Sequence, residues 1–102
     1  MKIYNKLVRD HIPDIIASDG QTCKTHILSD DEYVTALETK LDEEVAEYHA
    51  DKTVEELIDI LEVIHAIGIT KGYTLDDMIA MKNEKAHKKG NFFKKIYLES
   101  IE

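Results

Sequence analysis

Cysteine, proline, glycine and tryptophan, whose abundance is typical of particular protein classes, are scarce in this sequence. It contains one cysteine, Cys23, one proline, four glycines and no tryptophan in 102 residues. A single cysteine excludes a disulfide framework within the chain and a cysteine-rich zinc site. No apolar run is long enough for a membrane-spanning helix, and polar and basic residues interrupt the N-terminus from Lys2 to Arg9, unlike a signal peptide. We therefore expect one cytoplasmic domain, residues 1–102, with no membrane partner.

Basic residues are also scarce relative to acidic ones. The chain has 13 Lys and Arg against 21 Asp and Glu, for a net charge of −8. Nonspecific binding to nucleic acid depends on neutralisation of phosphates by Lys and Arg, so we expect no nucleic-acid partner. The charge is uneven: residues 30–62 hold thirteen acids and two bases, and residues 82–95 hold six lysines and one acid. This pattern suits a ligand that is itself a metal-bound polyanion, although solvated helix faces give similar runs.

Capping residues and apolar spacing predict an all-α chain. A short helix is expected from Pro13 to Ser18, ending near Gly20. Three long helices should follow: from about Asp30 to His49 after the cap Ser29, from Asp51 or Thr53 to about Lys71, and from Thr74 to Gly90. Residues 92–98 are expected to form a short extended segment that packs against the N-terminus.

The apolar residues of the long helices recur at helical spacing and predict which faces are buried. The first long helix carries Leu37, Leu41, Val45 and Tyr48, and the third carries Leu75, Met78 and Ile79. The second carries Leu57, Ile58, Leu61, Ile64 and Ile67, with Ile60 and Val63 beside that stripe. Since the segment between the first two is short and polar, those helices should form an antiparallel hairpin. So thin a helical bundle needs completion by oligomerisation, and we expect a homodimer or homotetramer.

Four carboxylates occur in two pairs at the same spacing. Glu44 and Glu47 form E-x-x-E, and Glu56 and Asp59 form E-x-x-D. Residues at i and i+3 share a helix face, so a hairpin would bring both pairs together. Such carboxylates repel unless a cation lies among them, and oxygen ligands favour Mg²⁺ or Mn²⁺.

Other interpretations of the acidic residues remain open. Carboxylates at this spacing are common on solvated helix faces, and Glu56 could instead serve a capping box with Thr53. If the metal interpretation holds, we favour Asp51 as that cap. Glu43 and Glu55 are expected to point outward, and Glu62 could join the site as a fifth acidic group.

Three segments together resemble the MazG-like all-α nucleotide pyrophosphohydrolases, especially the short phosphoribosyl-ATP pyrophosphohydrolase-like members. The E-E-x-x-E motif corresponds to residues 43–47, and E-x-x-D to residues 56–59. The opening segment of that subgroup is similar to residues 4–16, and its K-K-G-x-F segment to residues 88–92. The resemblance covers nearly the whole chain. The eight-residue spacer between Glu47 and Glu56 is shorter than in most full-length members, which bears on the substrate more than on the ligands.

The resemblance implies Mg²⁺-dependent cleavage of a nucleotide between its α and β phosphates. The products would be a nucleoside monophosphate and pyrophosphate. Glu44, Glu47, Glu56 and Asp59 match the family's metal ligands, and Glu44 or Glu47 could act as general base. Basic residues that could hold phosphate oxygens are Lys6, Arg9, Lys82, Lys85 and Lys88.

Three functions are compatible with these features. The first is a house-cleaning nucleoside triphosphate pyrophosphohydrolase that removes noncanonical nucleotides. The second is phosphoribosyl-ATP hydrolysis in histidine biosynthesis. The third is a noncatalytic helical module that binds a nucleotide or a partner protein. Metal-dependent release of pyrophosphate separates the enzymes from the module, and a panel of substrates separates the two enzymes.

Overall fold

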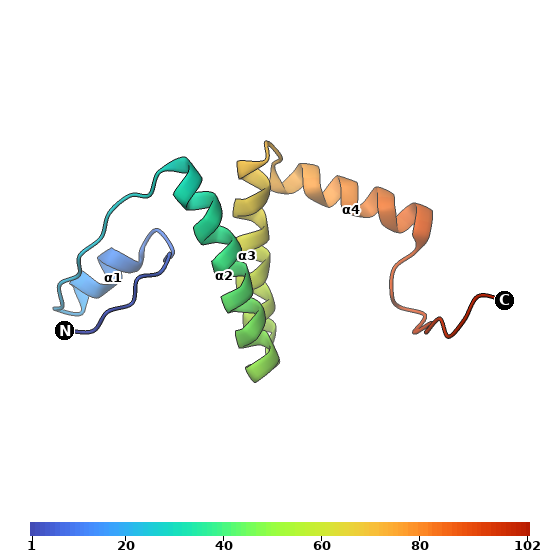
Figure 1. Cartoon of the computed structure of the whole chain (residues 1–102), viewed down its shortest axis with the longest axis horizontal. Coiled ribbons are helices and arrows are strands. Elements are labelled where there is room, and N and C mark those ends of the chain that lie inside the picture. The colour runs from blue at the N-terminus through green and yellow to red at the C-terminus, as the bar shows by residue number, and fades with distance from the viewer.

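The computed structural model describes the whole chain, residues 1–102, and contains four helices and no strand. The helices are α1 (Ile12–Ser18), α2 (Asp30–Asp51), α3 (Val54–Thr70) and α4 (Leu75–Lys89) (Figure 1). The prediction of an all-α chain is therefore confirmed, with helix ends within a few residues of those expected. None of the four helices is long and apolar enough to cross a membrane.

Local capping interactions set where α2 and α4 begin. The Ser29 hydroxyl accepts a hydrogen bond from the Glu32 amide at 3.2 Å, and the Glu32 carboxylate accepts one from the Ser29 amide at 3.0 Å. Thr74 and Asp77 make the same reciprocal pair at the start of α4. These capping boxes satisfy amide groups that have no partner inside the helix. The predicted caps at Ser29 and Thr74 are confirmed.

Helices α2 and α3 form the expected antiparallel hairpin (Figure 1). α2 continues to Asp51, and the chain then reverses through Lys52, whose φ of 58° lies in the left-handed region. Thr53 caps α3, and its hydroxyl accepts a hydrogen bond from the Glu56 amide at 3.4 Å. The cap that we favoured, Asp51, is wrong because that residue is still part of α2.

The predicted buried face is confirmed for α2 but not for α3. Leu37 is only 3% exposed, and Leu41, Val45 and Tyr48 are half-buried. On α3, Val63 is buried at 8% exposure, with Ile60 and Ile67 half-buried beside it. The residues predicted as the buried stripe of α3 are, except for Ile67, exposed by 40–54%: Leu57, Ile58, Leu61 and Ile64. The prediction was wrong because α3 is apolar on two opposite faces, and α2 covers only one of them.

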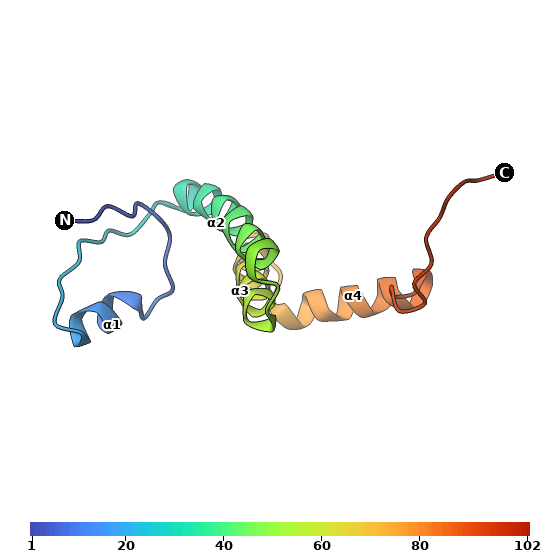
Figure 2. The same cartoon turned by 90° about the horizontal axis from the view of Figure 1, so that it is seen from below.

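A close contact fixes the corner between α3 and α4. Gly68 is buried, and the Met78 side chain lies so near that a Cβ added at Gly68 would be 2.5 Å from the Met78 sulfur. The Tyr73 amide donates to the Gly68 carbonyl at 2.9 Å, and Gly72, just after the end of α3, takes a φ of +88° that glycine adopts readily. Beyond this corner α4 leads away from the hairpin in both views (Figures 1 and 2).

The ends of the chain do not meet. α1 packs against no other helix, and the two termini lie at opposite ends of the molecule (Figure 2). The prediction that residues 92–98 pack against the N-terminus is therefore wrong for the single chain. The segment is irregular and fully exposed, with Phe92 at 98% and Tyr97 at 89% exposure. On α4, Leu75 and Met78 are half-buried at the corner, whereas Ile79 is exposed.

Candidate metal centre

The Glu44 carboxylate lies at the centre of the acidic residues of the hairpin. Glu44 is in the second half of α2 and is only 7% exposed. One oxygen of the Glu44 carboxylate and one oxygen each of Glu56 and Asp59 on α3 all lie within 4.8 Å of one another. A second group at the same spacing joins Glu44 to Glu43 and Glu47 on α2. The hairpin thus brings both predicted pairs to Glu44.

The two groups differ from the single four-carboxylate site expected from the sequence. Glu47 belongs with Glu43 and Glu44, and no group of three joins it to Glu56 and Asp59. Glu47 is exposed, whereas Glu56 and Asp59 are half-buried. Glu43 was expected to point outward, but its side chain is only 28% exposed. That prediction was wrong because ion pairs with two lysines hold Glu43 against the hairpin.

Two buried carboxylate oxygens have no hydrogen-bond partner in the structure. They are Oε2 of Glu44 and Oε2 of Glu56. An unpartnered oxygen in such a position costs free energy. Carboxylate oxygens of this kind are suitable ligands for a hard divalent cation. Thr53 and Glu56 do not form a reciprocal capping box, because only the Glu56 amide takes part in the cap. The Glu56 carboxylate is therefore free to serve as a metal ligand.

The proton affinities of these carboxylates reflect their crowding. Burial raises the pKa of Glu44, and the neighbouring carboxyl group of Glu47 raises it further, against the opposing charge of Lys40. Burial also raises the pKa of Glu56, together with repulsion from Asp51, Asp59 and Glu44. Carboxyl groups that resist ionisation without a cation are those whose charge a bound cation would stabilise.

Three basic residues partly compensate the acidic charge. Arg9 donates to Asp59 at 2.7 Å, and Lys6 contacts Glu43 at 3.4 Å. Lys40 lies 3.3 Å from Glu43 and 3.5 Å from Glu44. Burial alone would raise the pKa of Glu43, but its lysine neighbours outweigh that effect and lower it.

The sequence interpretation gave no role to Lys40, yet Lys40 touches the central carboxylate. A signal was present, because it precedes Glu43 and Glu44 by three and four residues, the spacing of helical ion pairs. Lys6 and Arg9 were predicted to bind substrate phosphates. Both lie beside the carboxylates, in the first segment of the chain.

The predicted lysines of α4 do not reach the carboxylates of the hairpin in their own chain. α4 contacts the hairpin only near the end of α3, and it then leads away (Figure 1). Lys82 and Lys85 are exposed, and Lys88 forms an exposed ion pair with Glu84 at 3.2 Å. A single chain therefore does not bring these three side chains to the carboxylates.

The remaining acidic residues stay outside the two groups. Glu55 is exposed, as predicted. Glu62 was considered as a fifth ligand, but it is exposed and lies 3.9 Å from His65 on the same helix. Neither residue lies in a group with Glu44.

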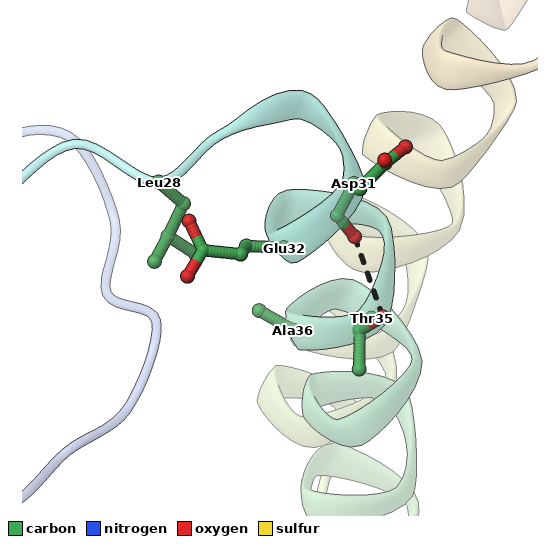
Figure 3. A pocket seen from close by; sticks show the side chains of 5 residues that line it. All are labelled: Leu28, Asp31, Glu32, Thr35 and Ala36. Atoms are coloured by element: carbon green, nitrogen blue, oxygen red, sulfur yellow. Dashed lines mark hydrogen bonds between the residues drawn. The ribbon is translucent and has the colours of Figure 1, made fainter.

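A separate depression lies at the start of α2 (Figure 3). It is lined by Leu28, Asp31, Glu32, Thr35 and Ala36. The Glu32 carboxylate serves the capping box there, and the Thr35 hydroxyl donates to the Asp31 carbonyl at 3.3 Å. This depression is at least two helical turns from Glu44 along α2, so its polar groups are part of the helix start and not of the acidic centre.

Comparison with known proteins gives one partial relative. Over 48 residues, 47% of this chain, the sequence is 56% identical to a protein of Mycolicibacterium smegmatis (strain ATCC 700084 / mc(2)155) that is described as uncharacterised. The matched stretch is 49% of that protein, so the chain spans about half of its length. No protein-family model and no solved structure matches the chain.

Proposed function

We propose that the chain is a Mg²⁺-dependent nucleotide pyrophosphohydrolase that cleaves between the α and β phosphates. The observation that carries the proposal is the Glu44 carboxylate. It is buried, it is shared by two groups of three carboxylates, and its Oε2 atom has no partner. A structural carboxylate in this position would be expected to have its oxygens paired.

The donor set fits a hard divalent cation. Glu44, Glu56 and Asp59 offer three carboxylate oxygens from two helices, and Glu43 and Glu47 offer two more. Only oxygen ligands are present, which favours Mg²⁺, with Mn²⁺ as the alternative. When bound, such an ion offsets the charge of phosphate oxygens and acidifies a water molecule.

The protein residues around the centre would position the substrate and move the proton. Glu47 is exposed beside Glu44, so it is accessible to a water molecule and is the better candidate for general base. Lys6 and Arg9 are already drawn to the carboxylates by ion pairs. A polyphosphate arriving at the same place would offer these cations a second set of oxygens.

The assembly that we propose is a homo-oligomer, a dimer or tetramer, in which the α2–α3 hairpin becomes part of an antiparallel helical bundle. The apolar outer face of α3 supports this, because a helix that is apolar on two faces is normally covered on both.

We also propose a cytoplasmic location, because the exposed and unpaired Cys23 suits a reducing environment.

A screen for pyrophosphate release tests the function. Nucleoside triphosphates, including noncanonical ones, and phosphoribosyl-ATP would be incubated with the protein in Mg²⁺, in Mn²⁺ and in EDTA. We expect release of pyrophosphate from a nucleoside triphosphate that stops in EDTA. The variant Glu44→Gln should lose this activity. Glu38→Gln is its matched control and should keep the activity, since Glu38 is exposed on the same helix and makes no ion pair. A protein that binds nucleotides and releases no pyrophosphate under any condition would contradict the proposal.

A further inference from the structure

The outer face of α3 is an apolar surface that nothing in the single chain covers. Its residues recur at three- and four-residue spacing along one side of the helix: Val54, Leu57, Ile58, Leu61 and Ile64. Each is at least 40% exposed, and Val54 reaches 68%. The face points away from Val63, which packs toward α2. A continuous apolar face of this length on a folded chain marks an interaction surface.

A second uncovered apolar surface belongs to what we call the arm, α4 with residues 90–102. After the corner at Gly68 and Met78 the arm makes no further contact with the hairpin. The large apolar side chains beyond α4 are at least 71% exposed, with Phe92 at 98%, Phe93 at 84% and Ile96 at 82%. The close contact at the corner directs α4 away from its own α3, so the arm does not cover the outer face of that helix (Figures 1 and 2).

The exposed area of the chain is large enough to account for a stable dimer. The chain exposes 9412 Å², whereas a folded monomer of its 11.7 kDa mass would expose about 5,900 Å². Its radius of gyration is 18.0 Å, against about 13 Å for a folded chain of about 100 residues. A stable dimer buries about 800 Å² on each partner, which is well below this excess.

Charge decides which surfaces of two copies meet. The hairpin region, residues 30–62, carries thirteen acids and two bases, so two hairpins placed face to face would bring like charges together. The end of the arm, residues 82–95, carries six lysines and one acid. A hairpin therefore matches an arm in charge as well as in apolar character.

We propose that two copies of this chain associate by exchanging arms. The arm of each copy lies along the outer face of α3 in the other, in a closed two-fold arrangement. The exchange concerns association, and it stands whether or not the centre binds a metal.

Cross-linking between two marked copies tests the exchange. In a Cys23→Ser background, one copy would carry Leu61→Cys on the outer face of α3, and a co-expressed copy would carry Phe93→Cys on the arm. Both sites are exposed in the single chain, so the helices should survive the changes. Circular dichroism checks this, and Ile58→Cys replaces Leu61→Cys if needed. Mild oxidation should link position 61 of one copy to position 93 of the other.

Two controls and a mass measurement decide the outcome. Glu38→Cys, exposed on α2, should link to the arm much less than Leu61→Cys does. The unmodified protein should sediment at about twice its 11.7 kDa mass, and a chain ending at Gly90 should dimerise more weakly. The exchange is overturned by a monomer at micromolar concentration, by position 61 linking mainly to position 61, or by Glu38→Cys linking as readily as Leu61→Cys.

Discussion

The hairpin and the arm are both helical, but they differ in what holds them. All four buried residues lie in the hairpin, among them Leu37, Glu44 and Val63. The arm has a capped helix and a lysine-rich end, and it buries none of its residues. Local interactions are thus enough to define a helix in both regions. The two helices of the hairpin pack against each other, whereas the arm contacts the hairpin only at the corner between Gly68 and Met78. The hairpin provides the proposed chemical centre, and the arm provides a surface suited to a second copy.

The largest expected effect comes from neutralising the central carboxylate of the hairpin. Glu44→Gln keeps the shape of the side chain and removes the one charge that the two clusters of three carboxylates share. We expect pyrophosphate release to fall roughly 100- to 1,000-fold, comparable to losing one electrostatic contact to the transition state. Initial rates with saturating Mg²⁺ measure this. Glu38→Gln should keep the parental rate, and an equal loss in both variants would contradict a special role for Glu44.

The corner between the two regions should be sensitive to side-chain volume. Gly68→Val places a Cβ where the Met78 sulfur would be 2.5 Å away, so Met78 must move. We expect the free energy of unfolding to fall by about 1–3 kcal/mol, the usual cost of overpacking. Urea denaturation measures it. Gly68→Val should cost less in a Met78→Ala background than in the parent, because the shortened side chain leaves room for valine. An equal cost in the two backgrounds would show that the two residues do not compete for space.

The lysines of the arm should affect substrate binding more than folding. Replacing Lys82, Lys85 or Lys88 singly by Ala should raise KM, by roughly tenfold for a residue that loses a charged hydrogen bond to phosphate. The melting temperature should stay within about 1–2 °C of the parent, since exposed ion pairs such as Lys88–Glu84 stabilise little. Steady-state kinetics and thermal melts check both points. Lys24→Ala, far from the arm in sequence, is the control, and parental kinetics in all three variants would leave the arm without a role in catalysis.

The smallest expected effect is the pH dependence of the cap of α4. A hydrogen bond from the Thr74 amide, then one from the Thr74 side chain, lowers the pKa of Asp77 from its usual 3.8. A carboxyl whose pKa is lowered by folding stabilises the folded state above the unfolded pKa, and this is lost as pH falls through the folded value. Asp77→Asn should therefore flatten the loss of helicity below about pH 4. Asp76→Asn removes the same charge from the first turn without removing the cap and is the control. Equal curves for the two variants would contradict the assignment to the cap.

Much of the helical architecture could be predicted because it depends on neighbouring residues. Ser29 and Thr74 cap the starts of α2 and α4, and Gly72 and Gly90 follow the ends of α3 and α4. The hairpin could be predicted because the segment that connects its two helices is short and polar. The outer face of α3 could not be assigned in the same way, because an all-round apolar helix does not show which side its own chain covers.

The candidate centre was predicted in part for a similar reason. Spacing identified Glu44, Glu56 and Asp59, which the hairpin brings together. It did not show that Lys6 would also hold Glu43 inward, since that contact involves the distant first segment, whereas Lys40 lies within one helical turn of Glu43. The position of the α4 lysines depends on the corner at Gly68, which helix periodicity does not reveal.

The measurement that tests the metal centre most directly is a set of four thermal melts. The parent and Glu44→Gln would each be heated with EDTA and with Mg²⁺. Without metal, Glu44→Gln should melt at the same temperature as the parent or higher, because a repelling, partly unpartnered charge is removed. Mg²⁺ should raise the melting temperature of the parent, and raise that of the variant less, because a ligand stabilises the folded state in proportion to its binding. Equal Mg²⁺ shifts in the two proteins would contradict a metal site at Glu44.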